Sequence, residues 1–312
     1  MSGKVSETVM ADADGIARAA AVLREGGLVA LPTETVYGLA ARADSEQAIA
    51  AIYRTKGRPD FNPLIVHVAD MEQAERLALF DDRARRVAAR FWPGPLTLVL
   101  PVRTDAAVAP AVTAGLPTIA LRMPAHPLMR AVLERTGLPL AAPSANRSGG
   151  VSPTTAAHVR ESFGPDAPPV LDGGACERGL ESTIVALRDF GWQLLRPGPI
   201  AAADVAALLG DAMAVAPNRI EAPGQLASHY SPGKPVRLSA AMPEAGEFMI
   251  GFGKVSGECS LSPGGDLAEA AARLYACLHE AARSDRPRVA VAPVPETGMG
   301  AAINDRLRRA AA

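Results

Sequence analysis

Several features that define large protein classes are scarce or absent in this 312-residue sequence. Its three cysteines, Cys176, Cys259 and Cys277, are widely spaced and form no CxxC pair, so neither a disulfide framework nor a cysteine-held zinc is expected. Reduced thiols favour a cytoplasmic location. No apolar run approaches the roughly 18 residues of a membrane helix, and the first residues lack the hydrophobic segment of a secretory signal. We expect no membrane-bound protein.

Excess charge and aromatic residues are also missing. The chain has 32 Lys and Arg against 33 Asp and Glu, and Phe, Trp and Tyr make up only 4%. A dedicated nucleic-acid-binding protein usually has a basic face and aromatic platforms for bases. The composition disfavours that class but leaves a local basic pocket open. With 48% hydrophobic residues, the chain can form sizeable cores, and its length allows two domains.

The common catalytic and nucleotide motifs do not occur. We find no GxxxxGK[ST], no GxGxxG opening a helix, no HExxH and no GxSxG. The stretch 251–254, Gly-Phe-Gly-Lys, is glycine-rich but lacks the hydroxyl residue and spacing of a phosphate loop, and we interpret it as a turn after a strand. The sequence therefore does not favour a P-loop enzyme, a zinc protease or a serine hydrolase.

Short apolar segments and amphipathic segments alternate along residues 1–210, which predicts an α/β domain. We expect one twisted, open sheet of mixed strand direction flanked by helices, with residues 32–39 as a loop. The segment 211–235 is rich in proline and glycine and is predicted to be a linker. Residues 236–312 follow the order β-α-β-α and predict a small second domain with a parallel strand pair. The predicted strands are 28–31, 64–66, 96–100, 118–122, 138–142, 170–171, 182–187, 192–196, 248–252 and 289–291.

Polar residues gather where the predicted strands end. The loop from Lys56 to Asn62 carries two cations within three residues, and Pro59 and Pro63 stiffen it. Ligands of open α/β sheets collect at strand ends, and Lys and Arg bind phosphate and carboxylate groups. The sequence therefore predicts one shared anion-binding cleft. Its other candidate segments are Thr33 to Thr35, His67, Arg122, Ser144 to Ser152, Ser182 and Arg196.

Several of these stretches together resemble the YrdC-like threonylcarbamoyl-AMP synthase family, in its longer, two-domain type. The resemblance covers roughly residues 10 to 210 and continues in Ser228 to Pro232, the domain that follows, and Ala302 to Leu307. The matching motifs of the first domain are Leu31 to Leu39, Lys56 to Pro59, Asn62 to His67, Trp92 to Thr97 and Ala142 to Asn146.

The resemblance implies an L-threonylcarbamoyladenylate synthase. Such a nucleotidyltransferase joins L-threonine, bicarbonate and ATP, and releases pyrophosphate. Its product serves the modification of the adenosine next to the anticodon of ANN-decoding tRNAs. The product would pass to a threonylcarbamoyl transferase complex, so any contact with tRNA would be indirect.

The resemblance also implies roles for individual residues. ATP would carry its own Mg²⁺, with no metal held by the protein. Tyr230, on the linker, would close over the nucleotide, so we expect residues 211–235 to form a lid; an ordered interdomain strap is the alternative. The family positions around ATP are Lys56, Arg58, Asn62, Thr118, Ser144, Ser152, Arg196 and Tyr230. Those around L-threonine are Thr35, His67, Arg122, Ala142 and Ser182.

No residue is an obvious general base. Lys56 and His67 are the catalytic candidates by residue type, and His67 could equally bind the substrate hydroxyl. Two other functions remain open at this point. One is a double-stranded RNA-binding or ribosome-associated module that uses the same basic concavity. The other is a carbamoyl-transfer module of the hydrogenase-maturation type, although that type carries zinc-finger and acylphosphatase-like segments that are absent here.

Overall fold

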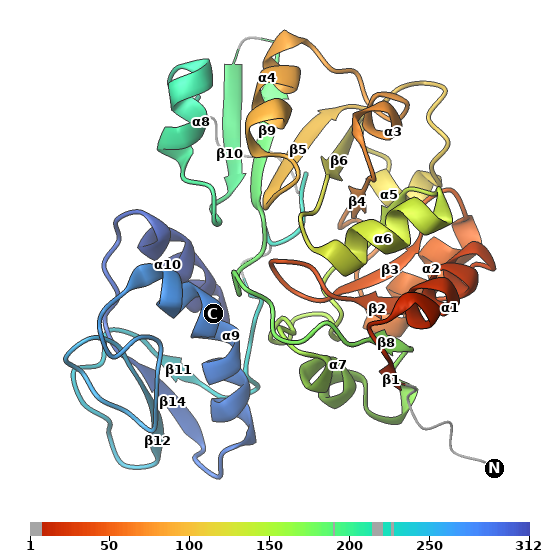
Figure 1. Cartoon of the computed structure of the whole chain (residues 1–312). Coiled ribbons are helices and arrows are strands. Elements are labelled where there is room, and N and C mark those ends of the chain that lie inside the picture. The colour runs from red at the N-terminus through yellow and green to blue at the C-terminus, as the bar shows by residue number, and fades with distance from the viewer. Residues whose placement is uncertain (1–7, 190, 214–220, 226–227) are drawn as a thin grey trace.

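The computed structural model describes residues 8–189, 191–213, 221–225 and 228–312. Figure 1 shows two domains, with the second one, in blue, packed beside the first. The first domain contains β1 (Thr8–Val9), α1 (Ala13–Arg24), β2 (Val29–Leu31), β3 (Gly38–Arg42), α2 (Glu46–Lys56), β4 (Ile65–His67), α3 (Met71–Glu75), α4 (Asp82–Phe91), β5 (Leu96–Pro101), α5 (Pro110–Thr113), β6 (Thr118–Arg122), α6 (Pro127–Thr136), β7 (Leu140–Ala141), α7 (Ala156–Phe163), the 3₁₀ turn η1 (Gly164–Asp166), β8 (Val170–Leu171), β9 (Thr183–Arg188), β10 (Gly191–Arg196) and α8 (Ala202–Leu209).

The strands of the first domain form one ten-stranded sheet in the order β1-β8-β2-β3-β7-β4-β6-β5-β9-β10. Parallel pairs such as β4 with β6 alternate with antiparallel pairs such as β5 with β6. The prediction of an open sheet with mixed strand direction is confirmed. Because β4 and β6 run in the same direction in register, His67 lies directly beside Arg122.

Helices cover both faces of this sheet. Successive side chains of a strand point to opposite faces, so apolar residues on both faces have to be buried. In β3, Leu39 and Ala41 enter the core beneath α2, α4, α7 and α8, whereas Ala40 enters the core beneath α1 and α6. A third apolar patch lies on β4, β5, β6, β9 and β10 on the face away from α4 and α8. There Ile65 and Ile184 pack together with Ala222 of the linker, which is fully buried.

Most local predictions are confirmed because their signals are local. Strand β6 has the predicted bounds, and Ser45 and Asp70 cap α2 and α3 through side-chain bonds to backbone N–H groups. Two predictions are wrong. Residues 38–42 form β3, whose sequence Gly-Leu-Ala-Ala-Arg has no β-branched residue to reveal a strand. Ser182 precedes β9 and does not follow a strand.

The second domain contains β11 (Val236–Arg237), β12 (Glu247–Gly251), β13 (Cys259–Ser260), α9 (Leu267–Arg283), β14 (Arg288–Val291) and α10 (Met299–Ala310). Its four strands are all parallel, in the order β11-β14-β12-β13. The two-residue strands β11 and β13 are too short to give a pattern in the sequence. The helix α9 lies between this sheet and the first domain (Figure 1). Across the described ranges, no helix is long and apolar enough to cross a membrane.

Candidate functional site

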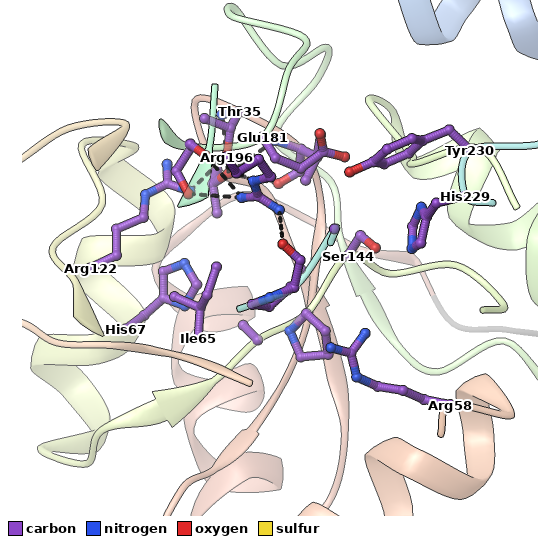
Figure 2. A pocket seen from close by; sticks show the side chains of 18 residues that line it. Thr35, Arg58, Ile65, His67, Arg122, Ser144, Glu181, Arg196, His229 and Tyr230 are labelled. Carbon is purple, nitrogen blue, oxygen red and sulfur yellow. Dashed lines mark hydrogen bonds between the residues drawn. The ribbon is translucent and has the colours of Figure 1, made fainter. Parts of the chain in front are cut away.

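One cavity collects most of the predicted site residues where the sheet, the loops at its strand ends and the linker meet (Figure 2). The end of β6 provides Arg122, the face of β4 provides Ile65 and His67, and the end of β10 provides Arg196. Nine predicted residues line the cavity: Thr35, Arg58, His67, Arg122, Ala142, Ser144, Ser182, Arg196 and Tyr230. The other lining residues are Thr33, Val36, Gly38, Ile65, Pro143, Glu181, Pro223, Gly224 and His229.

Two arginines on one side of the cavity are held by main-chain oxygens. Arg196 donates from Nε and Nη2 to the carbonyl of Ser182 at 3.1 and 3.0 Å, and from Nη1 to the carbonyl of Pro223. Arg58 donates from Nε to the carbonyl of Asn62 and from Nη2 to that of Pro63. Burial lowers the pKa of Arg58 to about 10, so it stays charged at neutral pH. Two fixed cations at one wall fit a ligand with several negative charges.

Four predicted ATP residues lie outside the cavity lining. Lys56 is buried, and its Nζ donates to the carbonyls of Ser144 and Asn146 at 2.6 and 2.5 Å. Burial lowers the pKa of Lys56 well below its usual value. The Ser152 hydroxyl donates to Glu181, and Asn62 is buried with its side-chain amide oxygen, Oδ1, unbonded. Thr118 begins β6, at the opposite end of that strand from Arg122. Lys56, Asn62 and Ser152 therefore support lining residues, and their direct contact with ATP stays a prediction, as does that of Thr118.

The other side of the cavity is built around a buried ion pair. Arg122 and Glu34 approach to 2.6 Å between Nη2 and Oε1, and both side chains are more than nine-tenths buried. Arg122 also donates from Nη1 to the Thr35 hydroxyl at 2.9 Å and from Nε to the Gly94 carbonyl. Burial acts to raise the pKa of Glu34, but the Arg122 charge together with hydrogen bonds from Arg122 and the backbone outweighs it, and the pKa is lowered. Arg122 is thus oriented on three sides, with its guanidinium at the cavity wall.

His67 lies beside this pair and is neutral. Burial, together with the charge of Arg122, lowers the pKa of His67 to about 3. Its Nδ1 is buried and has no hydrogen-bond partner. A buried polar atom without a partner at a cavity wall is positioned to bond a ligand. With so low a pKa, His67 is a weak base, which favours the hydroxyl-binding alternative over general-base catalysis.

The linker forms one wall of the cavity. Pro223, Gly224, His229 and Tyr230 all line it, and the Tyr230 side chain is buried. Tyr230 has a φ of 66°, in the left-handed region that an aromatic residue rarely adopts. The free space in the cavity is about 50 Å³, whereas pockets for small molecules usually measure roughly 300–1,000 Å³. A ligand as large as a nucleotide therefore requires the cavity to widen.

Sequence reasoning missed two carboxylates of the site. Glu34 stands within the motif from Leu31 to Leu39, but its role depends on Arg122, which is distant in the chain. Glu181 directly precedes Ser182, and its partners include residues of the second domain. The chain also carries no signal for Pro223 and Gly224 beyond their turn-forming types. Among the described residues, no cluster of His, Cys, Asp and Glu could hold a metal ion.

The fold and the cavity define a class of protein: a two-domain α/β protein with an arginine-rich cavity that the interdomain linker covers. Two family models match the chain. The Sua5/YciO/YrdC model, described as telomere recombination, matches residues 21–198. A model described as the threonylcarbamoyl-AMP synthase C-terminal domain matches residues 200–312. The chain belongs to the Sua5/YciO/YrdC family, in its two-domain form.

Relatives and solved structures agree with this placement. The chain is 40% identical to a threonylcarbamoyl-AMP synthase of Bacillus subtilis, over 95% of this chain and 92% of the relative. It is 39% identical to that of Pyrococcus abyssi, over 94% and 92%. The crystal structure of P. abyssi Sua5 complexed with L-threonine superposes with a TM-score of 0.90 at 36% identity, covering 99% of this chain and 98% of that one. Escherichia coli YciO, at 21% identity and a TM-score of 0.53, shares the fold of the first domain.

Proposed function

We propose that this protein is an L-threonylcarbamoyladenylate synthase, which converts L-threonine, bicarbonate and ATP into threonylcarbamoyl-AMP and pyrophosphate. One observation carries the proposal: a single cavity brings Arg58 and Arg196 together with Arg122, Thr35 and His67. Full-length similarity to threonylcarbamoyl-AMP synthases, one of them solved with L-threonine, supports the same reading.

The side around Arg122 suits the amino acid. A guanidinium can bind a carboxylate through two parallel hydrogen bonds. The neutral His67 and the Thr35 hydroxyl stand beside it and can bond a substrate hydroxyl. Ser182, whose hydroxyl bonds Thr97 at 2.7 Å and accepts from Arg196 Nη2 at 3.1 Å, adds a further polar group to the lining next to Arg196. The backbone at Ala142 adds neutral hydrogen-bonding groups.

The side around Arg58 and Arg196 suits the nucleotide phosphates, with Ser144 and Tyr230 close to them in the lining. Both carboxylate oxygens of Glu181 are bonded within the protein. We therefore propose that Mg²⁺ would arrive bound to the phosphate oxygens of ATP and would neutralise charge on the leaving pyrophosphate. The direct ATP contacts of Lys56, Asn62, Thr118 and Ser152 form part of the same proposal.

The reaction then needs positioning more than a covalent protein intermediate. The threonine amine loses a proton and attacks the carbon of bicarbonate or carbon dioxide, and bicarbonate loses water in this step. A carbamate oxygen attacks the α-phosphorus, and pyrophosphate leaves. Holding three reactants in one cavity provides most of the rate gain, and the arginines stabilise the leaving group. The linker wall shields the carbamate from water.

We further propose that the product leaves for a separate transferase that modifies tRNA, in the cytoplasm. The three cysteines are free and buried, in keeping with a reducing compartment. The site does not support the alternative of an RNA-binding module, because its arginines are buried side chains and not an exposed basic surface.

A pyrophosphate-release assay tests the proposal. Purified protein receives ATP, Mg²⁺, L-threonine and bicarbonate, and each component is omitted in turn. We expect release only with the full set, and the adenylate should be visible by mass spectrometry. Serine in place of threonine serves as a control for the amino-acid side. Release that needs only ATP, or none with the full set, would rule the proposed reaction out.

A further inference from the structure

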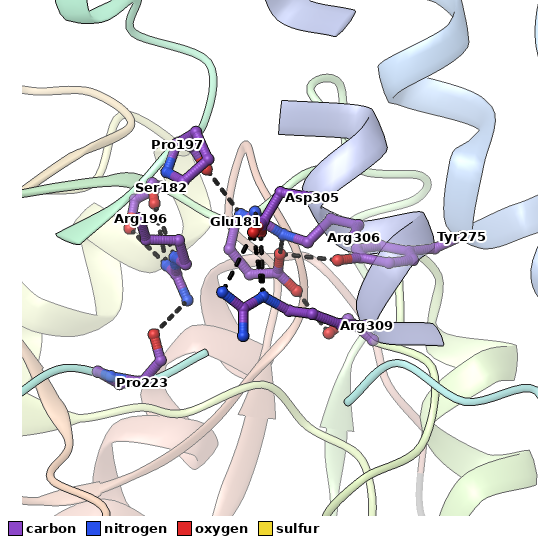
Figure 3. A network of polar contacts seen from close by, with 10 residues as sticks. Glu181, Ser182, Arg196, Pro197, Pro223, Tyr275, Asp305, Arg306 and Arg309 are labelled. Atoms are coloured by element: carbon purple, nitrogen blue, oxygen red, sulfur yellow. Dashed lines mark hydrogen bonds and ion pairs between the residues drawn. The ribbon is translucent and has the colours of Figure 1, made fainter. Parts of the chain in front are cut away.

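A buried carboxylate in the cavity wall connects the two domains. Glu181 receives hydrogen bonds on both oxygens (Figure 3). Its Oε1 accepts from the Ser152 hydroxyl at 2.6 Å, and its Oε2 accepts from the Tyr275 hydroxyl at 2.8 Å and from Arg306 Nε at 2.9 Å. Ser152 and Glu181 belong to the first domain, whereas Tyr275 and Arg306 belong to α9 and α10 of the second.

Arg306 touches two further parts of the nucleotide side. It is fully buried, and its Nη2 donates to the carbonyl of Pro197, the residue that follows Arg196. Its guanidinium lies 5.5 Å from the centre of the Tyr230 ring. The Tyr275 ring also stacks with the Tyr230 ring, at 5.5 Å between the ring centres. Arg306 and Tyr275 of the second domain thus pack against Tyr230, the linker residue that lines the cavity.

The charge of Glu181 needs a partner for ATP to bind. Glu181 lines the same cavity as Arg58 and Arg196, so an unpaired negative charge there would repel a triphosphate. Burial acts to raise the pKa of Glu181, but the charges of Arg306 and Arg196, together with hydrogen bonds from Ser152 and Arg306, outweigh it and lower the pKa to about 2. The carboxylate is therefore ionised at neutral pH, and only Arg306 among these cations bonds it directly.

We propose that Arg306, in the second domain, is a positioning residue of the nucleotide site. It neutralises Glu181, which lets that carboxylate hold the Ser152 hydroxyl without repelling the phosphates, and it supports the Tyr230 ring at the cavity wall. The second domain thus completes the ATP site of the first. This inference rests on the proposed function for the identity of the ligand, ATP.

The competing explanation is a plain interdomain brace, and a matched residue separates the two. Arg283 of α9 also bridges the domains, through an ion pair with Glu161 at 2.9 Å, but that pair is half-exposed and does not line the cavity. Arg283→Met therefore removes one cation and one interdomain pair without touching the ATP site. A brace alone predicts similar effects of the two arginine substitutions on ATP affinity.

The experiment measures ATP affinity by calorimetry and the KM values for ATP and L-threonine by pyrophosphate release. Arg306→Met should raise the Kd and KM for ATP by about tenfold or more, with a much smaller change in the KM for threonine. Arg306→Met combined with Glu181→Gln should recover most of the ATP affinity, because residue 181 then carries no charge and Asp305, which also pairs with Arg306, keeps its ion pair with Arg309. Arg283→Met should leave both values for ATP unchanged.

Arg306→Lys keeps the test decisive if Arg306→Met does not fold. Lysine retains the positive charge, so the Kd for ATP should stay within about threefold of the parent protein while the thermal midpoint falls. An equal loss in Arg306→Lys and Arg306→Met, an equal loss in Arg283→Met, or no recovery in the double variant would overturn the proposal. A parent protein that binds ATP but releases no pyrophosphate would refute the proposed reaction instead, and the calorimetric comparison would still decide the role of Arg306.

Discussion

Replacing Arg122 tests the amino-acid side of the cavity. If its guanidinium binds the threonine carboxylate, Arg122→Met removes a charge-assisted hydrogen bond worth roughly 1.5–3 kcal/mol. Affinity for threonine should then fall by about 10–100-fold. ATP binding should be nearly unchanged, because Arg58 and Arg196 keep their main-chain anchors.

The same substitution has a second effect, on stability. Arg122 is the partner of Glu34, and neither side chain is exposed by more than a tenth. Removing one member of a buried pair costs about 3–5 kcal/mol, because the remaining charge is left without compensation. A loss of threonine binding in the single variant could therefore come from local unfolding alone.

A double variant separates the two effects. Combining Arg122→Met with Glu34→Gln removes both charges and should restore much of the thermal midpoint. Threonine affinity, measured by calorimetry, should stay low in this variant, since no guanidinium is present. The single variant Glu34→Gln keeps Arg122 and should bind threonine at least as tightly as the parent protein. The reasoning is refuted if threonine affinity returns together with stability in the double variant.

Three further predictions concern the nucleotide side and pH. Arg58→Ala should weaken ATP binding more than AMP binding. Arg58→Lys should restore ATP binding only partly, because lysine lacks the forked guanidinium of arginine. Equal losses of affinity for both nucleotides in calorimetry would contradict this. Tyr230→Ala should lower pyrophosphate release. ATP together with threonine should protect the linker of the parent protein from protease. Unchanged cleavage and unchanged activity would show that the linker is only an interdomain strap. Burial lowers the pKa values of three histidines to about 3, so at acidic pH the unfolded chain binds more protons than the folded chain. Their contribution to the free energy of unfolding is complete above about pH 6.5 and should fall as the pH drops, by up to about 1.4 kcal/mol per pH unit for each histidine. A thermal midpoint that stays constant from pH 7.5 to 5 would refute this. These histidines are His67, His158 and His229.

The sequence predicts well what depends on neighbouring residues. Helix caps such as Ser45 and apolar strands such as β6 are set by a few neighbouring residues. Cations at strand ends could also be grouped into one cleft, because strand ends meet at the same edge of a sheet. Strand β3 was missed because its small residues have low strand propensity, and it forms through pairing with β2 and β7.

The missing parts of the site depend on contacts between distant segments. Glu34 becomes part of the site only through Arg122, and Glu181 only through Arg306 in another domain. A carboxylate in a loop shows no pattern that distinguishes a buried ion pair from a solvated charge. The free volume behind the linker wall is likewise a property of packing, which periodicity and motif spacing do not describe.

The anchors of the arginines give the two halves of the cavity different ways to recognise a ligand. Arg58 and Arg196 are fixed by neutral oxygens, so no counterion has to leave when phosphates arrive, and the protein dipoles are already oriented. Arg122 shares its charge with Glu34, which weakens its pull on a second carboxylate. Under the proposed function, the nucleotide is attracted by the positive charge of arginines that neutral oxygens hold in place. The amino acid is selected by the fit of its hydroxyl and carboxylate to fixed partners. Discrimination among amino acids then resides in geometry, and ionic strength should matter chiefly for the nucleotide.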